Sequence, residues 1–252
     1  QIKYFYDVNV KGMENLIESS VKNGIKRIVA ISSNSPCGVN PSNNHLFDEK
    51  YDYNPYLNYG YSKMLMEKLL IEKMKKGDIE TIILRPPWFY GPYHPNRQIR
   101  FYKMIKDGRV PLCGNGSNKR SMACTINISQ AMIRAGMIEK INNSIYWIAD
   151  ESPYTFIEII NTIRKVMNDE FGFNCRNNYL RIPGFVSDVA YLADKVIQGV
   201  GFYNKEIHVL SEMNKTIACS IDKAKIDLNY KPTIDLYVGT YLSIKSSIEE
   251  FN

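Results

Sequence analysis

A tyrosine and a lysine four residues apart carry the clearest chemical signal in this chain. They lie in the segment Tyr59-Gly60-Tyr61-Ser62-Lys63, and the apolar residues that follow recur at helical spacing without Gly or Pro. Both side chains should then lie one turn apart on the same helix face. Because an ammonium at that distance favours the phenolate, we expect Lys63 to lower the pKa of Tyr59. A phenol with a lowered pKa can act as a general base.

Two predicted strands end close to this helix in the sequence. The run over 25–33 is a short buried strand that ends in the hydroxyls of Ser32 and Ser33. The run over 81–84 is a second strand, and it stops before a pair of prolines because proline cannot continue a ladder. Helices alternate with these strands, which is typical of a parallel α/β sheet. Ligands of such sheets bind beyond the carboxyl ends of the strands. The hydroxyls and the prolines both follow such ends, so they indicate that the ligand site lies at this edge of the sheet.

Seven short segments occur in a defined order along almost the whole chain. They are Asp7 to Gly12, Ile31-Ser32-Ser33 with Gly38 five residues on, Tyr59 to Lys63, Leu84 to Pro92, Pro111 to Gly116, Arg120 to Met122, and Asp222 to Pro232. Together they resemble the extended short-chain dehydrogenases/reductases of the NAD-dependent epimerase/dehydratase type. The resemblance implies an α/β fold with a Rossmann-like, doubly wound parallel sheet and a smaller carboxy-terminal substrate lobe.

The resemblance also implies catalytic roles. Tyr59 would be the base that takes a substrate hydroxyl proton while hydride leaves the same carbon for the nicotinamide. Lys63 would hold the nicotinamide ribose and depress the pKa of Tyr59. Ser33 would hydrogen-bond the reacting oxygen. Ser32 is the alternative, less favoured because the family's usual position is five residues before Gly38.

Four more positions would contact the cofactor or the substrate. Pro86 and Pro87 would line the pocket of the nicotinamide, of NAD or NADP, through backbone atoms. Arg120 matches an arginine that pairs with the substrate diphosphate in sugar-nucleotide relatives, which suits its fixed fork of donors. The alternative is a solvated Arg120 beside Lys119. Trp88 stands where sugar-nucleotide dehydratases carry a small polar substrate contact, so a flatter or less polar substrate is an alternative.

The chain has no Gly-rich turn of the kind that binds a dinucleotide pyrophosphate at a helix amino terminus. Its two Gly-x-Gly pairs lack the third glycine, because Lys119 and Asn204 occupy the corresponding positions. By the resemblance, residues 7–10 belong to the fourth helix of the fold. We therefore expect a partial Rossmann-like sheet that lacks its first strands and the pyrophosphate turn, and a truncated, non-catalytic fragment is one interpretation.

The domain organisation follows from these segments. Residues 1–90 and 127–150 are expected to be the remainder of the Rossmann-like NAD(P)-binding domain. Residues 91–126 are richer in Pro, Gly, Asn and Arg and should leave the sheet, forming the substrate-binding lobe with residues 151–252. The later predicted elements are helices over 128–141, 154–168, 185–198 and 235–251 and a strand over 144–149.

The segment from Pro183 to Asp194 supports a rival substrate class. It is an apolar-rich helix behind a proline. Similar segments occur in relatives that resemble 3β-hydroxysteroid dehydrogenases and flavonol reductases, whose substrates are apolar. The interpretation we favour is that the helix packs its apolar stripe into the small lobe, with Asp188, Asp194 and Lys195 on the other face.

Composition argues against membrane, nucleic-acid-binding and metal-binding classes of protein. The chain has 252 residues, is 44% hydrophobic and has no run near 18 apolar residues, so we expect a globular protein with no transmembrane helix and no membrane partner. The net charge of +6 is spread along the chain, which argues against nucleic acid as a partner. Five cysteines without a Cys-x-x-Cys pair indicate reduced thiols and a cytoplasmic protein, and three scattered histidines give no metal site.

The predicted function is that of an NAD(P)-dependent epimerase or oxidoreductase acting on a secondary alcohol of a nucleotide sugar by Tyr-assisted hydride transfer. A dehydratase is disfavoured, because Asn34-Ser35 follows Ser33 where those relatives add an acidic pair. An oxidoreductase acting on an apolar alcohol, like the 3β-hydroxysteroid dehydrogenases or flavonol reductases, remains the alternative. A homodimer through the helices over 9–23 and 59–75 is also considered.

Overall fold

Three parallel strands form the sheet of the amino-terminal part of the chain. The computed structural model describes residues 2–139 and 145–251. β1 (Arg27–Ile31) pairs with β2 (Glu80–Arg85), and β2 pairs with β7 (Ile145–Trp147). Both pairings are parallel, so the predicted parallel α/β class is confirmed. The third strand was predicted to begin at residue 144, which lies outside the described residues.

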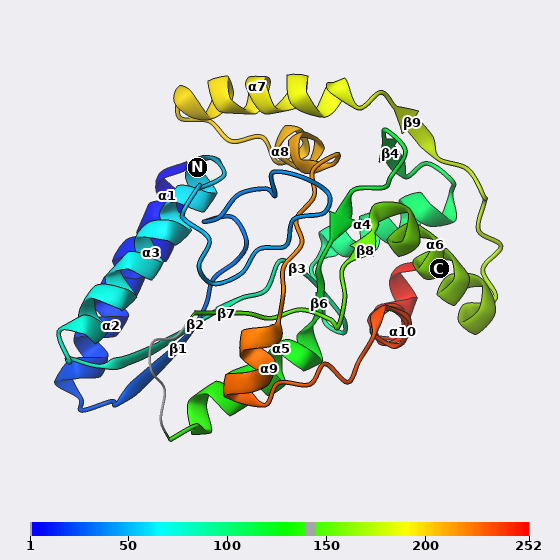
Figure 1. The fold of residues 1–252 in the computed structure, drawn as a ribbon. Coiled ribbons are helices and arrows are strands. Elements are labelled where there is room, and N and C mark those ends of the chain that lie inside the picture. Colours follow the sequence, from blue (N-terminus) through cyan, green and yellow to red (C-terminus); the bar gives the residue numbers. More distant parts are fainter. Residues whose placement is uncertain (1, 140–144, 252) are drawn as a thin grey trace.

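Helices flank this sheet and make up much of the remaining structure (Figure 1). In chain order they are α1 (Ile2–Tyr6), the π-helix η1 (Asp7–Lys11), α2 (Gly12–Lys22), α3 (Leu57–Lys75), α4 (Asn96–Lys106), α5 (Thr125–Met137), α6 (Phe156–Phe171), α7 (Phe185–Gly199), α8 (Lys205–Glu212), α9 (Asp222–Leu228), α10 (Leu236–Lys245) and the 3-10 helix η2 (Ile248–Phe251). The short strands are β3 (Trp88–Tyr90), β4 (Pro111–Cys113), β5 (Lys119–Arg120), β6 (Met122–Cys124), β8 (Tyr154–Thr155) and β9 (Leu180–Ile182). In the part of the chain that the structure describes, no helix combines the length and the apolar character needed to cross a membrane.

The two faces of the sheet are covered by different helices. One apolar cluster joins the sheet to α2 and α3 through Ile17, Ile28, Ala30, Met66, Leu70 and Ile83. The other joins the opposite face to α5 and α9 through Ile82, Leu84, Ile128, Ala131, Ala224 and Leu228. Because successive strand residues point to opposite faces, a sheet buried on both sides needs a continuous apolar run. This is why β1 and β2 consist largely of Ile, Val, Ala and Leu.

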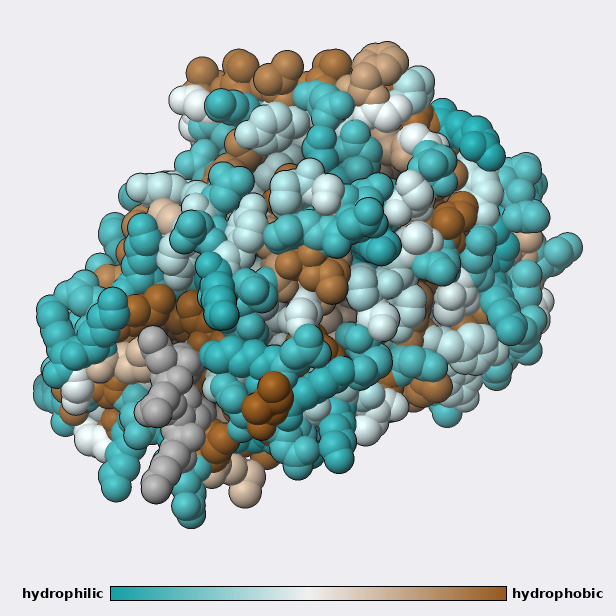
Figure 2. Space-filling model, in the orientation of Figure 1, coloured by the Kyte–Doolittle hydropathy of each residue, from teal (hydrophilic) through white to brown (hydrophobic). Residues whose placement is uncertain are grey.

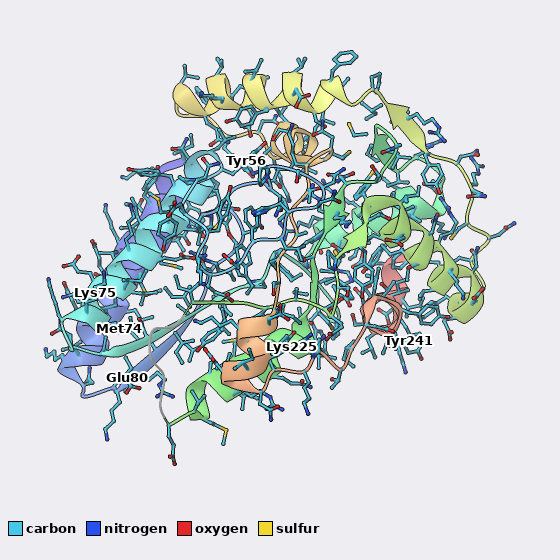
Figure 3. The ribbon with its side chains drawn as sticks, in the orientation of Figure 1. Tyr56, Met74, Lys75, Glu80, Lys225 and Tyr241 are labelled. Atoms are coloured by element: carbon cyan, nitrogen blue, oxygen red, sulfur yellow. The ribbon has the colours of Figure 1, made fainter. Side chains whose placement is uncertain are left out.

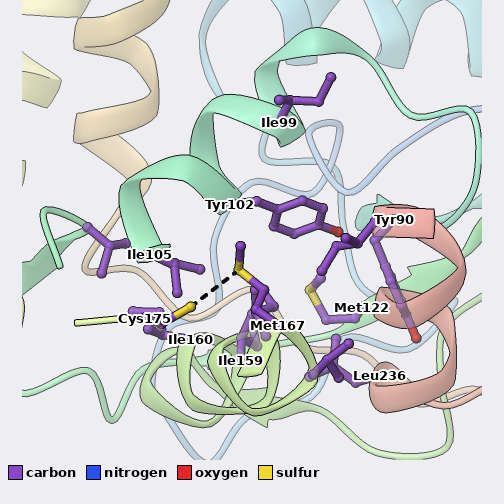
Figure 4. Packing of buried hydrophobic residues seen from close by; sticks show 14 of the residues in the cluster. Tyr90, Ile99, Tyr102, Ile105, Met122, Ile159, Ile160, Met167, Cys175 and Leu236 are labelled. Atoms are coloured by element: carbon purple, nitrogen blue, oxygen red, sulfur yellow. Dashed lines mark hydrogen bonds between the residues drawn. The ribbon is translucent and has the colours of Figure 1, made fainter. Parts of the chain in front are cut away.

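A second apolar core lies among the later elements. Figure 4 shows α4 and α6 packed through Tyr102, Ile105, Ile159 and Ile160, with Met167 beside Cys175 at 3.9 Å between their sulfur atoms. β4 pairs with β9 and β5 pairs with β8, so segments from 91–126 and 151–252 interleave. These pairings are compatible with the predicted substrate lobe, whose boundaries stay a prediction.

Local capping explains why α6 is shifted from its predicted range of 154–168. The Thr155 side chain accepts a hydrogen bond from the Glu158 backbone, and the Glu158 carboxylate accepts one from the Thr155 backbone. This capping box sets the first turn. Gly172 adopts a φ of +67° after the last turn, which is the usual end of a helix at glycine. The helix predicted over 128–141 is also shifted, to Thr125–Met137, and residues 140 and 141 lie outside the described residues.

The predicted orientation of the helix over 185–198 is wrong. In α7, Asp194 is fully buried, whereas Phe185, Val189, Leu192 and Val196 are each at least 58% exposed. Asp194 faces inward because its carboxylate is bonded to His208 Nδ1 at 2.7 Å and to Gln198 Nε2 at 2.9 Å. The apolar stripe therefore points to solvent, and Figure 2 shows it as a brown band along the upper edge of the molecule.

A buried ion pair connects α3 to the carboxyl end of β2. The Arg85 Nε donates to Glu67 Oε1 at 3.0 Å and Nη2 donates to Oε2 at 2.5 Å, and both side chains are at most 2% exposed. The Tyr53 hydroxyl donates to the same carboxylate at 2.8 Å. The rings of Tyr53 and Trp147 each lie 5.4 Å from the guanidinium carbon. Such a pair is sensitive to the loss of one partner, because the other charge would stay buried without compensation.

We expect Glu67→Gln to lower the free energy of unfolding by about 3–5 kcal/mol, since it removes the charge and leaves the Arg85 guanidinium buried. Urea unfolding followed by circular dichroism measures this change. Glu72→Gln is the matched control on the same helix, because Glu72 pairs with Lys76 at the exposed surface and should change the stability little. Equal losses in the two variants would show that the buried pair has no special part in holding α3.

Candidate functional site

One of the two hydroxyls predicted at the end of β1, that of Ser33, lies next to Tyr59. Ser32 and Ser33 directly follow β1, and both are buried. The Ser33 Oγ accepts a hydrogen bond from the Ser35 backbone at 3.1 Å, and the Ser33 side chain lies close enough to Tyr59 to lower the pKa of that phenol. The structure thus brings together Ser33 and Tyr59. The Ser32 hydroxyl is buried and has no hydrogen-bond partner among the described residues.

A close approach of two backbones sets the distance between α3 and the loop after β1. A Cβ added to Gly60 would lie 2.4 Å from the Ser35 carbonyl oxygen and 3.2 Å from the carbonyl carbon of Pro55. The backbone N–H of Tyr56 also donates to the Ser35 carbonyl at 2.8 Å. Only glycine fits at position 60 without a shift, so this contact places Tyr59 within reach of Ser33.

Lys63 lies one turn after Tyr59 and points to the end of β1. Its Nζ donates to the Ile31 carbonyl oxygen at 3.2 Å and lies 3.8 Å from the Met66 sulfur. Burial lowers the pKa of Lys63, and the nearby charge of Glu67 opposes this. An ammonium has three donors, so Lys63 retains capacity for a ligand oxygen.

The expected lowering of the Tyr59 pKa is wrong for this structure. Burial is the largest influence and raises the pKa of Tyr59, and the neighbouring Ser33 side chain and the charge of Arg97 partly offset this rise. The ring of Phe5 lies edge-on to the Tyr59 ring at 5.5 Å between centroids, and Tyr203 packs on Phe5 in turn. These aromatic rings contribute to excluding water from the phenol, and desolvation disfavours the phenolate.

The two prolines lie at the same edge of the sheet as Ser33. Pro86 and Pro87 directly follow β2, with Pro86 buried and Pro87 half-buried. β1 and β2 run in parallel with Ile31 opposite Leu84, and the Ser32 backbone donates to the Leu84 carbonyl at 2.7 Å. The ends of the two strands are therefore adjacent. The cofactor role of the prolines stays a prediction.

Arg120 is buried, so its interpretation as a solvated side chain is wrong. Its Nη2 donates to the Glu212 carbonyl oxygen at the end of α8, and its Nε has no partner among the described residues. Burial lowers the pKa of Arg120, and the charges of Glu212 and Tyr56 oppose this. Tyr56 lies between α3 and α8 (Figure 3), with its hydroxyl 2.7 Å from Ser211 Oγ. The charge of Glu212 acts on both Arg120 and Tyr59, and the contact of Arg120 with a substrate stays a prediction.

Trp88 lies at the start of β3 and packs toward the second core. Its ring stacks on Phe156 at 6.4 Å between centroids and lies 5.5 Å from Phe101. The side chain is half-buried. These contacts assign Trp88 a packing role, and its contact with a substrate stays a prediction.

Sequence reasoning missed Arg97 as a site residue. Arg97 is exposed in the first turn of α4, and its guanidinium carbon lies 5.2 Å from the centre of the Phe89 ring. Its charge lowers the pKa of both Tyr59 and Tyr203. The available signal was Pro95, since proline is common at the start of a helix and would have marked α4.

Comparisons with known proteins identify the family of the chain. The model of the NAD-dependent epimerase/dehydratase family matches residues 1–146, so the chain belongs to this family. The uncharacterized protein y4nL of Sinorhizobium fredii is 44% identical over 244 residues, which cover 96% of this chain and 68% of that protein.

A named enzyme and a solved structure are also similar to this chain. The N-acetyl-α-D-glucosaminyl-diphospho-ditrans,octacis-undecaprenol 4-epimerase of Escherichia coli O157:H7 is 35% identical over 126 residues, or 49% of this chain and 37% of that enzyme. The structure of the UDP-glucose 4-epimerase of Thermotoga maritima with UDP-glucose superimposes with a TM-score of 0.73 at 20% identity. The match covers 100% of this chain and 73% of that one, and at this identity it supports the fold alone.

We expect Gly60→Ala to lower the free energy of unfolding by roughly 1–3 kcal/mol, because the new methyl group overlaps the Ser35 carbonyl. Thermal and urea unfolding measure the change. Gly136→Ala is the control in α5, where an added Cβ meets nothing within 4 Å and should be neutral or stabilising. A neutral Gly60→Ala would contradict the close approach that positions Tyr59.

Proposed function

We propose that the protein is an NAD(P)-dependent epimerase or oxidoreductase that oxidises a secondary alcohol of a nucleotide sugar. The observation that carries this proposal is the proximity of Ser33 to Tyr59, with Lys63 one turn away, beside the carboxyl ends of β1 and β2. Parallel α/β sheets bind their ligands at this edge. Membership of the epimerase/dehydratase family supports the reaction class.

The geometry supports a division of labour between two hydroxyls. Ser33 donates a hydrogen bond to the reacting oxygen and holds it next to Tyr59. Tyr59 takes the proton of the substrate hydroxyl as the C–H hydride departs. The nicotinamide, when bound, accepts that hydride. Because burial raises the Tyr59 pKa, Tyr59 retains its proton at neutral pH in this structure, which suits it as the acid of the reverse step.

The residues present fit the nicotinamide end of the cofactor. Lys63 has unused donors for the ribose hydroxyls, and the orphaned hydroxyl of Ser32 lies at the same strand end. Pro86 and Pro87 provide backbone surface beside them. Residues 1–252 contain no Gly-x-x-Gly-x-x-Gly segment for the pyrophosphate, so this fit concerns the nicotinamide and its ribose.

A sugar diphosphate is the substrate class that Arg120 supports. The side chain is 8% exposed, and its unpartnered Nε is a donor that a phosphate oxygen would satisfy. The solved Thermotoga enzyme holds UDP-glucose, and the Escherichia coli relative is named for a sugar linked to a polyprenol through diphosphate. The diphosphate is common to both, and we propose the nucleotide-linked form for this chain.

A second copy of the chain is the proposed partner, through the helices over 9–23 and 59–75. The two helices lie side by side, with Asn9 Nδ2 donating to Ser62 Oγ at 2.9 Å (Figure 1). Val8, Leu16 and Tyr61 are each at least 45% exposed near this pair. Exposed apolar side chains on neighbouring helices are typical of a protein–protein interface.

Tyr59→Phe should reduce kcat by about a hundredfold or more with little change in KM, because it removes only the ionisable oxygen. The assay uses the natural polypeptide that carries residues 1–252, with NAD or NADP and a panel of nucleotide sugars. Oxidation by the unmodified protein should rise with pH through the alkaline range, since the raised pKa keeps Tyr59 protonated at neutral pH. Tyr61→Phe is the control, because Tyr61 is 45% exposed on the same helix. Normal turnover by Tyr59→Phe would exclude Tyr59 as the base.

Arg120→Ala should raise the KM for nucleotide sugars by roughly ten- to a thousandfold, because a charge-assisted fork to the diphosphate is lost. Its effect on apolar secondary alcohols should be small. Arg100→Ala is the control, since Arg100 is exposed on α4. If sugar nucleotides were insensitive to Arg120→Ala and apolar alcohols were turned over, the alternative class of 3β-hydroxysteroid dehydrogenase-like or flavonol reductase-like enzymes would be correct. If the protein turned over neither nucleotide sugars nor apolar alcohols, the interpretation as a non-catalytic fragment would be supported.

A further inference from the structure

The outward face of α7 has an apolar stripe that the proposed activity does not use. Phe185, Val189, Leu192 and Val196 follow one another at intervals of four, three and four residues, so they share one face of the helix. They are 65%, 58%, 62% and 68% exposed, and Val200 continues the stripe at 69%. We call these five residues the apolar ridge. Contiguous exposed apolar surface of this kind marks a contact with another body.

Hydrogen bonds on the inner face prevent α7 from burying its ridge by rotation. The Gln198 side chain accepts from the backbone and side-chain nitrogens of Asn58, both at 3.1 Å, and Gln198 also donates to Asp194. Asp194 is bonded to His208 of α8. A rotated helix would leave a buried carboxylate and a buried amide without partners, which is costly. The outward direction of the ridge is therefore fixed by the fold.

The charges around the ridge are mainly positive. Between residues 180 and 206 the exposed charged side chains are Arg181, Lys195, Lys205 and two carboxylates, Asp188 and Glu206. Asp188 is paired with Lys215, which leaves an excess of positive charge. Beside the start of α7, a pocket of about 690 Å³ is lined by Arg109 and Arg181, among others. An apolar strip bordered by cations complements a surface that is apolar inside and carries anionic phosphates outside.

The shape of this region also favours a flat occupant. α7 lies along the outer edge of the molecule, with no other described element beyond it (Figure 1), and the ridge forms that edge in Figure 2. A helix of 15 residues is about 22 Å long and about 10 Å wide, a footprint of roughly 220 Å². Stable dimers bury about 800 Å² per partner, so pairing of two ridges alone is too small. A bilayer needs no complementary groove.

We propose that α7 docks the protein on the surface of an anionic phospholipid bilayer. The ridge inserts at the boundary of headgroups and acyl chains, while Arg181, Lys195 and Lys205 meet lipid phosphates. α7 lies in the plane of the membrane and does not cross it, in accord with the absence of a membrane-crossing helix among the described residues. This departs from the expectation of no membrane partner. It is independent of the proposed catalytic function.

Co-sedimentation of the chain with vesicles tests the proposal. The vesicles are phosphatidylcholine alone and equal parts of phosphatidylcholine and phosphatidylglycerol. The unmodified chain should bind the anionic vesicles, and Leu192→Glu should lower the partition coefficient by about tenfold or more. Lys195→Gln should weaken binding to the anionic vesicles only. Ile226→Glu is the matched control, because Ile226 is an 81% exposed apolar residue on α9 and its change should have no effect.

Two outcomes would overturn the proposal. In one, the unmodified chain does not bind anionic vesicles at all. In the other, a folded Leu192→Glu variant binds them as well as the unmodified chain does. Circular dichroism and thermal unfolding establish that the variant is folded, and Leu192→Gln provides a second, uncharged substitution. Sedimentation velocity tests whether a second copy of the chain, and not a bilayer, covers the apolar ridge. A dimer that Leu192→Glu dissociates, without vesicle binding, would assign the ridge to a second copy of the chain.

Discussion

The buried ion pair of Glu67 and Arg85 is the constraint on which the site depends. Tyr59, Lys63 and Glu67 recur every four residues, so they lie along one face of α3. Arg85 is the last residue of β2, directly before the prolines. The bidentate contact therefore fixes both the rotation and the axial position of α3 relative to the carboxyl edge of the sheet. The close approach at Gly60, in the first turn of α3, then sets the distance between the phenol and the serine hydroxyl.

The ionisation of Tyr59 is governed by competing surroundings. Burial raises its pKa, whereas Ser33 and the charge of Arg97 act in the opposite direction. A phenol in this position holds its proton firmly and can release it to an alkoxide-like oxygen. Arg97 comes from α4, outside the helix and strands that supply the other groups, so the later part of the chain also tunes the site.

Local patterns were sufficient to place much of this edge from the sequence. Apolar β-branched runs and the terminating prolines indicated β1 and β2, and helical spacing indicated α3. The rest depended on contacts between distant residues. Asp194 was expected at the surface because its partner His208 belongs to another helix. The direction of the Tyr59 pKa shift was missed because Phe5, far away in the sequence, packs edge-on against its ring.

The central claim is that Ser33 and Tyr59 hold one substrate oxygen while Arg120 holds the diphosphate. A crystal structure of the protein with NAD and a nucleotide sugar tests this most directly. The account predicts a sugar hydroxyl within about 2.6–3.2 Å of both the Tyr59 and Ser33 hydroxyls. It also predicts a phosphate oxygen on the Arg120 Nε, which has no partner among the described residues. A sugar bound with its hydroxyls remote from Tyr59 and its diphosphate away from Arg120 would contradict the account.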